Sequence, residues 1–162
     1  MKAIIVYCSK TGTTEKVAQA VRRALPVPVD MLRLDLNVFG LQQTYSSNFT
    51  IDLEAYDLIF LGGWTMVMRV HPFMACYIRE CAHLEHKTVA GFFTGGALFS
   101  RGHVRSDFEL LLAQRGAQFV DFHFITTLLG PGLTRGKLRK AEDFARGVFE
   151  AHQRLMTTPK AP

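Results

Sequence analysis

The chain alternates short apolar runs with stretches of helical spacing, and this alternation restricts its fold more than any other feature. Five runs predict buried strands, at Ala3–Tyr7, Val29–Leu34, Leu58–Gly62, Thr88–Phe93 and Gln118–Ile125. Apolar positions three and four apart predict helices over Thr13–Leu25, Pro72–Ala82, Val104–Arg115 and Gly136–Met156. Strands that are apolar throughout and alternate with helices are typical of a parallel sheet covered on both faces. The sequence therefore predicts a doubly wound, three-layer α/β fold.

A length of 162 residues suits one domain. We predict that this domain spans residues 1–156 and that residues 157–162 form a frayed tail. Residues 37–54 have no clean periodicity and predict a long connection. No stretch approaches the ~18 apolar residues of a membrane span, and the first residues lack a signal-peptide pattern, so we expect no membrane insertion. Three cysteines (Cys8, Cys76 and Cys81) cannot all pair, which favours free thiols in a cytoplasmic protein.

The net charge of +5 is spread along the chain, and its densest cluster is RGKLRK at residues 135–140. So mild an imbalance does not predict nucleic-acid binding. His83 and His86 lie three residues apart near a helix end, but no third ligand accompanies them, so we expect no metal. The sequence has no spacing typical of a catalytic triad or of paired carboxylates, and we assign no catalytic residue.

The segment CSKTGTT, between the first strand and the first helix, collects four hydroxyl side chains around Gly12. A helix start presents unpaired N–H groups and a positive dipole end, and a glycine lets the backbone approach a ligand closely. One N-cap would explain only one hydroxyl. The glycine patterns of nucleotide-triphosphate and dinucleotide loops are missing. The segment therefore predicts a site for a single phosphate monoester.

These residues carry a resemblance to a known family. SKTGTT directly after an N-terminal strand resembles the phosphate loop of flavodoxins, and the order of elements is similar over residues 1–152. The resemblance implies a five-stranded parallel sheet of order 2-1-3-4-5 and non-covalently bound FMN. It implies that Ser9, Thr11, Gly12, Thr13 and Thr14 contact the FMN phosphate; Lys10 belongs to the same cofactor-binding loop, and we expect its side chain to point to solvent.

The resemblance also assigns two later loops to the flavin ring. The first follows the third strand and contains Gly63, Trp64, Thr65 and Met66; the second follows the fourth strand and contains Thr94, Gly95, Gly96 and Phe99. Met66 takes the position of the aromatic residue usual in the family, and the single tryptophan lies two residues earlier. Both Trp64 and Met66 therefore remain candidates for covering the ring.

As a function, the resemblance implies an electron carrier that exchanges electrons with a redox protein and is a monomer or weak dimer. Two alternatives stay open: an FMN-dependent NAD(P)H:quinone-type oxidoreductase, and a flavin-free interaction module. Flavodoxins are usually acidic, whereas the predicted flavin loops here are accompanied by Arg69, His71, Arg101, His103, Arg105 and Arg135. These residues form either an ordinary solvated face or a basic rim. A basic rim would stabilise an anionic reduced flavin and favour an acidic redox partner.

Overall fold

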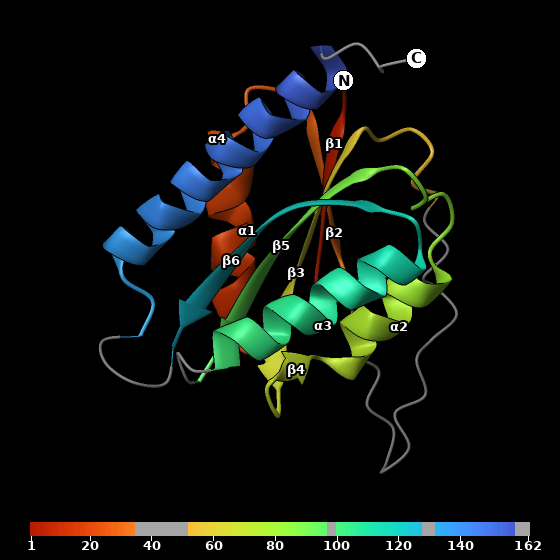
Figure 1. Cartoon of the computed structure of the whole chain (residues 1–162). Helices are drawn as coiled ribbons and strands as arrows, with labels where there is room; N and C mark the ends of the chain where they lie inside the picture. The colour runs from red at the N-terminus through yellow and green to blue at the C-terminus, as the bar shows by residue number, and fades with distance from the viewer. Residues whose placement is uncertain (35–51, 97–99, 128–131, 158–162) are drawn as a thin grey trace.

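The computed structural model describes residues 1–34, 52–96, 100–127 and 132–157. Its centre is a sheet with five parallel strands, shown in Figure 1. The strands are β1 (Ala3–Tyr7), β2 (Val29–Arg33), β3 (Leu58–Met66), β5 (Thr88–Gly95) and β6 (Gln118–Thr126). They lie in the order β2-β1-β3-β5-β6. Numbered by chain position, the parallel strands have the order 2-1-3-4-5, so the predicted fold is confirmed.

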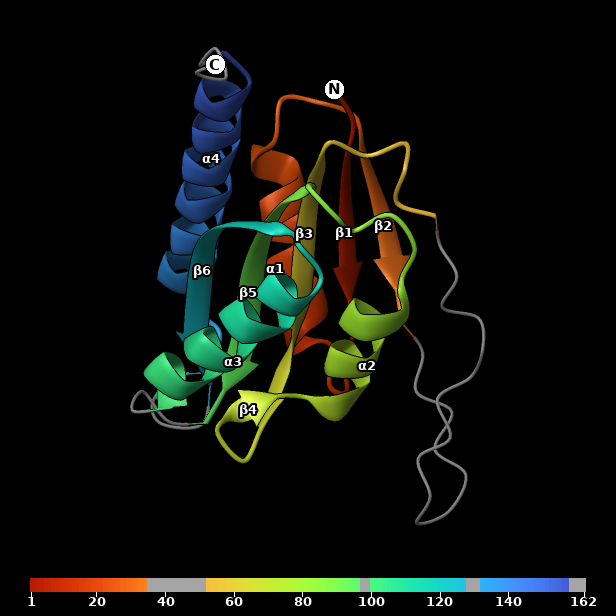
Figure 2. The same cartoon turned by 45° about the vertical axis from the view of Figure 1, so that its right-hand side comes forward.

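Two helices cover each face of the sheet, as Figures 1 and 2 show. One face is covered by α1 (Thr13–Ala24) and α4 (Arg135–Thr157), and the other by α2 (Pro72–Glu80) and α3 (Arg101–Gln114). The N-terminus lies near the end of α4, and the short strand β4 (Arg69–Val70) lies at the opposite end of the molecule. The carboxyl ends of the strands point toward β4.

The strand β1 shows why its sequence is apolar throughout. Successive side chains of a strand point to opposite faces. Ile4 and Val6 enter the hydrophobic core shared with α2 and α3, whereas Ala3, Ile5 and Tyr7 enter the core shared with α1 and α4. Both faces of this central strand are therefore buried, and no position along it tolerates a charged side chain.

Two glycines make room for aromatic rings in these cores. A Cβ on Gly91 of β5 would lie 2.5 Å from Cε1 of Phe108, which projects from α3. A Cβ on Gly62 of β3 would overlap the ring of Phe92 from the neighbouring strand. The missing side chains allow α3 and the strands to pack closely.

The largest departure from the sequence prediction lies after Gly62. The predicted strand ended there, but β3 continues to Met66 and forms a hairpin with β4, in which Thr65 pairs with Val70 and Met66 with Arg69. The prediction of an open loop was therefore wrong. The two adjacent glycines led us to predict a strand end. In the structure the buried side chain of Val70 packs the returning strand against the core.

The turn of this hairpin has unusual residues. Val67 and Met68 connect the two strands with φ angles of 47° and 62°. Hairpin turns with two positive φ angles normally use Asn-Gly or Gly-Gly. For a residue with a Cβ, the left-handed conformation costs about 1–2 kcal/mol, and a β-branched valine is a clear outlier there.

Smaller differences concern element ends. The helix α3 begins at Arg101, three residues before the predicted start at Val104. The helix α4 reaches Thr157, the first residue of the predicted tail, and the rest of that tail lies outside the described residues. Most of the predicted connection over residues 37–54 also lies outside them, and Asp52 forms an isolated parallel bridge with Ala82.

Two further observations bear on the predicted chemistry of the chain. The three cysteines are free, as predicted. Burial raises the pKa of the Cys8 thiol to about 12, so this residue is a packed thiol. Among the described residues, no helix has the length and apolar character that crossing a membrane requires.

We predict that Gly91→Ala destabilises the protein by about 1–3 kcal/mol, because the added methyl group would displace the Phe108 ring from a packed core. Gly147→Ala in α4 is the matched control. Nothing lies within 4 Å of a Cβ at Gly147, so this change should stabilise the helix by about 0.5–1 kcal/mol. Urea denaturation of both variants measures the two free energies of unfolding. Equal stabilities of the two variants would show that the contact with Phe108 does not restrict this site.

Candidate functional site

The three segments assigned to a cofactor meet at one edge of the sheet. β1, β3 and β5 are neighbours, and at their carboxyl edge residues 9–14 follow β1, whereas residues 63–66 and 94–95 form the ends of β3 and β5. The Cys8 N–H donates to the Gly62 carbonyl at 3.0 Å, and Trp64 pairs with Thr94 in the register between β3 and β5. Strand order thus brings together residues that are about eighty positions apart.

The first segment forms an open helix start. Gly12 occupies the N-cap of α1 with φ 82°, a left-handed conformation that favours glycine, and it has no side chain with which to cap the helix. The Gly12 N–H donates to Ser9 Oγ at 3.1 Å, which folds the loop back on itself. The hydroxyls of Thr11 and Thr13 lie 3.2 Å apart at the surface. In the described part of the chain, no side chain accepts from the N–H groups of the first turn, residues 13–15, so these donors remain for a ligand.

A buried pair of hydroxyls connects this loop to the end of β5. Thr14 Oγ1 and Thr94 Oγ1 lie 3.0 Å apart, and both residues are almost fully buried. Sequence reasoning placed both residues at the cofactor but did not foresee their contact. The pair fixes the first turn of α1 against the strand that leads to the second ring loop.

Arg33, at the end of β2, supports the loop from the other side. Its guanidinium group donates to the Ser9 carbonyl at 3.3 Å and to Glu15 Oε2 at 3.1 Å. The sequence analysis missed this residue, although a cation at the end of the strand beside β1 was a visible signal. Lys10 is exposed, as expected for its position before the glycine.

The end of β3 presents the two candidates for covering a flat ring. Trp64 is half-buried and packs against His71, with 4.2 Å between the ring centroids and 47° between the planes. Met66 lies two residues further along, and the residue is 46% exposed. A Cβ on Gly63 would lie 3.1 Å from Cys8 Sγ, so the glycine lets β3 approach the end of β1.

The second ring loop touches the first. A Cβ on Gly95 would meet the Thr65 hydroxyl and the ring of Phe124, so the ends of β3, β5 and β6 are closely packed at this point. Gly96 follows in a half-buried position. Phe99 lies outside the described residues.

His71 is not part of a solvated rim, and that expectation was wrong. Only 4% of the residue is exposed, and its Nδ1 accepts from the Phe73 N–H at 3.2 Å, which caps α2. The neutral ring therefore carries its proton on Nε2. Burial, and to a lesser extent the charge of Lys10, lowers the pKa of His71.

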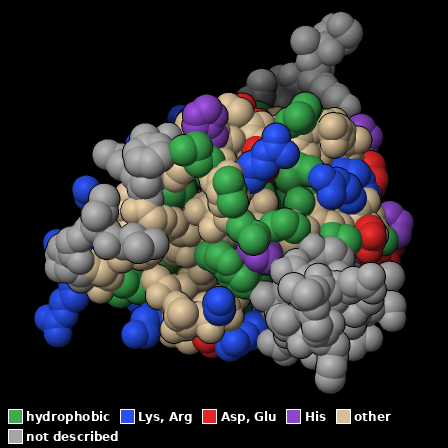
Figure 3. All heavy atoms as spheres, turned by 90° about the horizontal axis from the view of Figure 1, so that it is seen from below, with side chains coloured by type: hydrophobic (Ala, Val, Ile, Leu, Met, Phe, Trp, Pro, Cys, Tyr) green, Lys and Arg blue, Asp and Glu red, His purple; other side chains and the backbone are tan. Residues whose placement is uncertain are grey.

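The other basic residues named in the sequence are at the surface. Arg69, Arg101, His103 and Arg135 are exposed, and Arg105 forms an ion pair with Glu109 at 2.7 Å. Figure 3 shows the end of the molecule that carries β4, where hydrophobic side chains gather in the middle with Lys and Arg side chains around them.

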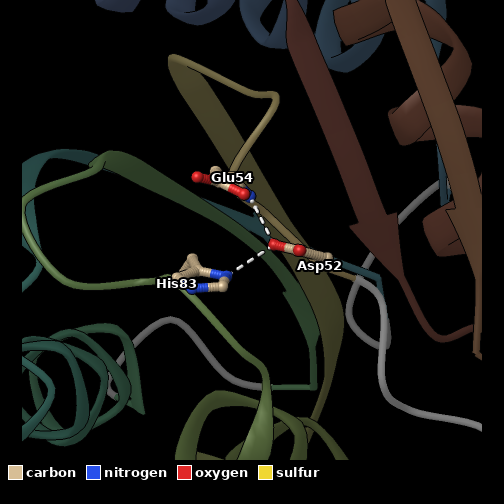
Figure 4. Close-up of side chains that lie close together, drawn as sticks. All are labelled: Asp52, Glu54 and His83. Carbon is tan, nitrogen blue, oxygen red and sulfur yellow. Dashed lines mark hydrogen bonds and ion pairs between the residues drawn. The ribbon is translucent and has the colours of Figure 1, made fainter.

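A separate group of side chains combines Asp52, Glu54 and His83, shown in Figure 4. Asp52 Oδ1 accepts from the Glu54 N–H at 2.8 Å and lies 2.6 Å from His83 Nδ1. The contact with Asp52 raises the pKa of His83. All three residues are exposed, and exposed acidic groups of this kind are common without a bound metal. We interpret this group as an ion pair beside a turn.

We predict that acidification destabilises the protein, in part through His71. The pKa of His71 in the folded chain lies below the ordinary value of 6.5, so the unfolded chain binds more protons as the pH falls below that value. The free energy of unfolding should therefore decrease from pH 7 toward pH 5. His71→Asn keeps a capping acceptor and should give a shallower decrease, whereas His71→Ala should also lose about 1 kcal/mol at pH 7.5 through the missing cap. Urea denaturation at several pH values measures the free energy of unfolding as a function of pH. The same pH dependence for wild type and His71→Asn would contradict the role of His71.

Comparison with known proteins agrees with this architecture. A family model described as "Flavodoxin domain" matches residues 4–146. A curated protein of Methylocella silvestris named "NAD(P)H dehydrogenase (quinone)" is 32% identical over 145 residues, which cover 82% of this chain and 68% of the relative. The structure of oxidised flavodoxin 2 from Bacillus cereus has a TM-score of 0.68 at 25% identity and covers 93% of this chain and 99% of its own. A flavoprotein from Lactobacillus acidophilus, solved in complex with FMN, has a TM-score of 0.61 at 17% identity, over 76% of this chain and 92% of its own. This chain therefore belongs to the flavodoxin domain family.

Proposed function

We propose that this protein binds FMN at the carboxyl edge of its sheet and exchanges electrons with a redox protein. The observation that carries the proposal is the open start of α1, where Gly12 leaves the first-turn N–H groups without a cap. The same loop carries the hydroxyls of Ser9, Thr11 and Thr13. Such a donor set suits a phosphate monoester, because backbone N–H groups and the helix dipole both favour a dianion.

The residues around this helix start also fit the rest of the cofactor. Trp64 and Met66 lie at the end of the strand beside β1, and Thr94 to Gly96 lie at the end of the next strand. A flat ring gains about 0.5–1.5 kcal/mol from an aromatic neighbour beyond the area that it buries. His71 would act through Trp64, because its ring packs against the indole and its own position is fixed by the cap of α2.

In this proposal the protein supplies binding and orientation, and FMN supplies the electron-transfer chemistry. Ser9, Thr11, Thr13 and the first turn of α1 would hold the phosphate. The Thr14–Thr94 pair would keep the phosphate loop and the ring loop at a fixed separation. We propose no catalytic residue among the described residues.

We predict that the purified apoprotein binds FMN at least about 100-fold more tightly than riboflavin. The two ligands differ by the phosphate, and each charge-assisted hydrogen bond contributes about 1.5–3 kcal/mol. The quenching of flavin fluorescence during titration gives both dissociation constants. Equal affinities would overturn the phosphate assignment, and no binding of either ligand would favour the flavin-free module.

We predict that Thr11→Ala combined with Thr13→Ala weakens FMN binding about tenfold or more and leaves riboflavin binding nearly unchanged, because the two hydroxyls face the phosphate alone. Ser106→Ala on the exposed surface of α3 is the control and should leave both dissociation constants unchanged. A parallel loss of affinity for both ligands would show that the threonines act on the fold of the loop.

A second candidate is a quinone-type oxidoreductase that takes a hydride from NAD(P)H, and the name of the Methylocella silvestris relative favours it. The carrier proposal predicts that NADPH alone does not bleach the visible absorbance of the FMN-loaded protein within the time of a stopped-flow experiment. A reduced redox protein should bleach it. Rapid bleaching by NADPH would replace the carrier with the oxidoreductase.

A further inference from the structure

The hairpin between β3 and β4 exposes an apolar surface beside the proposed cofactor site. Exposure is 86% for Val67, 46% for Met66 and 40% for Met68, and Leu110 of α3 is 58% exposed. These four residues are more than half of the large hydrophobic residues that are exposed in the described part of the chain. The others, Met1, Leu155 and Met156, lie at the opposite end of the molecule. We call the first group, Met66, Val67, Met68 and Leu110, the hairpin patch.

The surface of the hairpin patch is hollowed where it meets the helices. One hollow of about 320 Å³ lies between the hairpin and α2, lined in part by Val67, Arg69 and Arg79. Another of about 310 Å³ lies between the hairpin and α3, lined in part by Met68, His103 and Leu110. Apolar residues next to hollows of side-chain size are typical of the centre of a protein interface.

Three arginines lie around the hairpin patch, and one carboxylate, Asp107, lines both hollows. No ion pair joins Arg69, Arg79 or Arg101 to a carboxylate of the described residues, and all three are exposed. The nearest carboxylate of the hollows, Asp107, accepts a hydrogen bond from the Val70 N–H at 3.0 Å and so is engaged in holding the hairpin. A partner with an apolar centre and an acidic rim is complementary to this surface.

The strained turn indicates that the apolar tip is not needed for folding. Val67 and Met68 adopt positive φ angles in which Asn-Gly would fit without strain, and their side chains extend away from the core. Backbone strain of this kind clusters at functional sites. Here it presents two apolar side chains at the outermost point of the hairpin.

We propose that the hairpin patch is the docking surface for the redox partner, and that this partner is a protein with an acidic surface around an apolar centre. This inference rests on the proposed electron-transfer function. Val67, Met68 and Leu110 make the apolar contact, whereas Arg69, Arg79 and Arg101 guide and orient the acidic rim. Docking here places the partner beside Trp64, which lies two residues before the end of β3.

The test uses an acidic [2Fe–2S] ferredoxin as the probe. The ¹⁵N-labelled full chain is titrated with it at low salt, and amide shifts give both the contact surface and the dissociation constant. We expect the largest shifts in residues 66–70 and 101–110. Val67→Asn combined with Met68→Gly should weaken binding at least about tenfold and raise Tm by about 2–4 °C, because the turn becomes relaxed while the apolar contact is lost. Arg69→Glu should weaken binding about fivefold or more, and added salt should weaken binding by the wild type.

Leu155→Ser combined with Met156→Ser is the matched control, because it removes exposed apolar side chains at the opposite end of the molecule. Its affinity should stay within about twofold of wild type. Absence of ferredoxin binding at low salt, shifts centred elsewhere, or unchanged binding by the Val67→Asn/Met68→Gly variant would each overturn the proposal. Loss of self-association in that variant, measured by sedimentation without ferredoxin, would instead assign the patch to a second copy of this chain. The titration is repeated with the apoprotein, so that a failure to bind FMN is distinguished from a failure of the docking surface.

Discussion

The burial of both faces of the parallel sheet is the constraint on which the rest of this structure depends. β1 lies between two strands and under two pairs of helices, so its side chains divide between two separate cores. Such a sheet has no solvated face on which a ligand could bind, and its functional groups must lie at its edges. The carboxyl edge is where loops leave β1, β3 and β5 side by side. These strands pack closely, with glycines where they approach most nearly. Because a packed core leaves little room for displacement, this packing fixes the separation of the loops.

The candidate site inherits its geometry from this packing. The open start of α1 faces the edge because Gly12 turns the chain directly after β1, and the buried hydroxyls of Thr14 and Thr94 hold that turn against β5. The site is therefore supported by long-range contacts instead of by the local sequence of any one loop. This support explains how the loop before α1 can be positioned against the end of β5, which follows it by some eighty residues. It also means that residues such as Arg33, outside the recognisable motif, contribute to the position of the loop.

The sequence predicted the parts of this molecule that follow from local patterns. Strand and helix positions follow from apolar periodicity, and the turn into α1 at Gly12 follows from a glycine among small hydroxyl side chains after the first strand. The β3–β4 hairpin was missed because Val67 and Met68 carry none of the residues that signal a turn. His71 was misplaced in a solvated rim because its burial depends on Trp64 and on the cap of α2, which only the tertiary structure brings together. The contact between Thr14 and Thr94 has no local signal at all.

The site is assembled from segments at residues 9–14, 63–66 and 94–96, and this has a consequence for the lifetime of the protein. None of these segments has its neighbours in the unfolded chain, so a ligand that needs all three binds the native state alone. Mass action then adds about 2.7 kcal/mol to the stability when the free ligand is at a hundred times its dissociation constant. Proteases and aggregation act on the unfolded fraction, and this added stability lowers that fraction. The amount of this protein that a cell retains would thus follow the supply of its ligand, even where the rate of synthesis is constant.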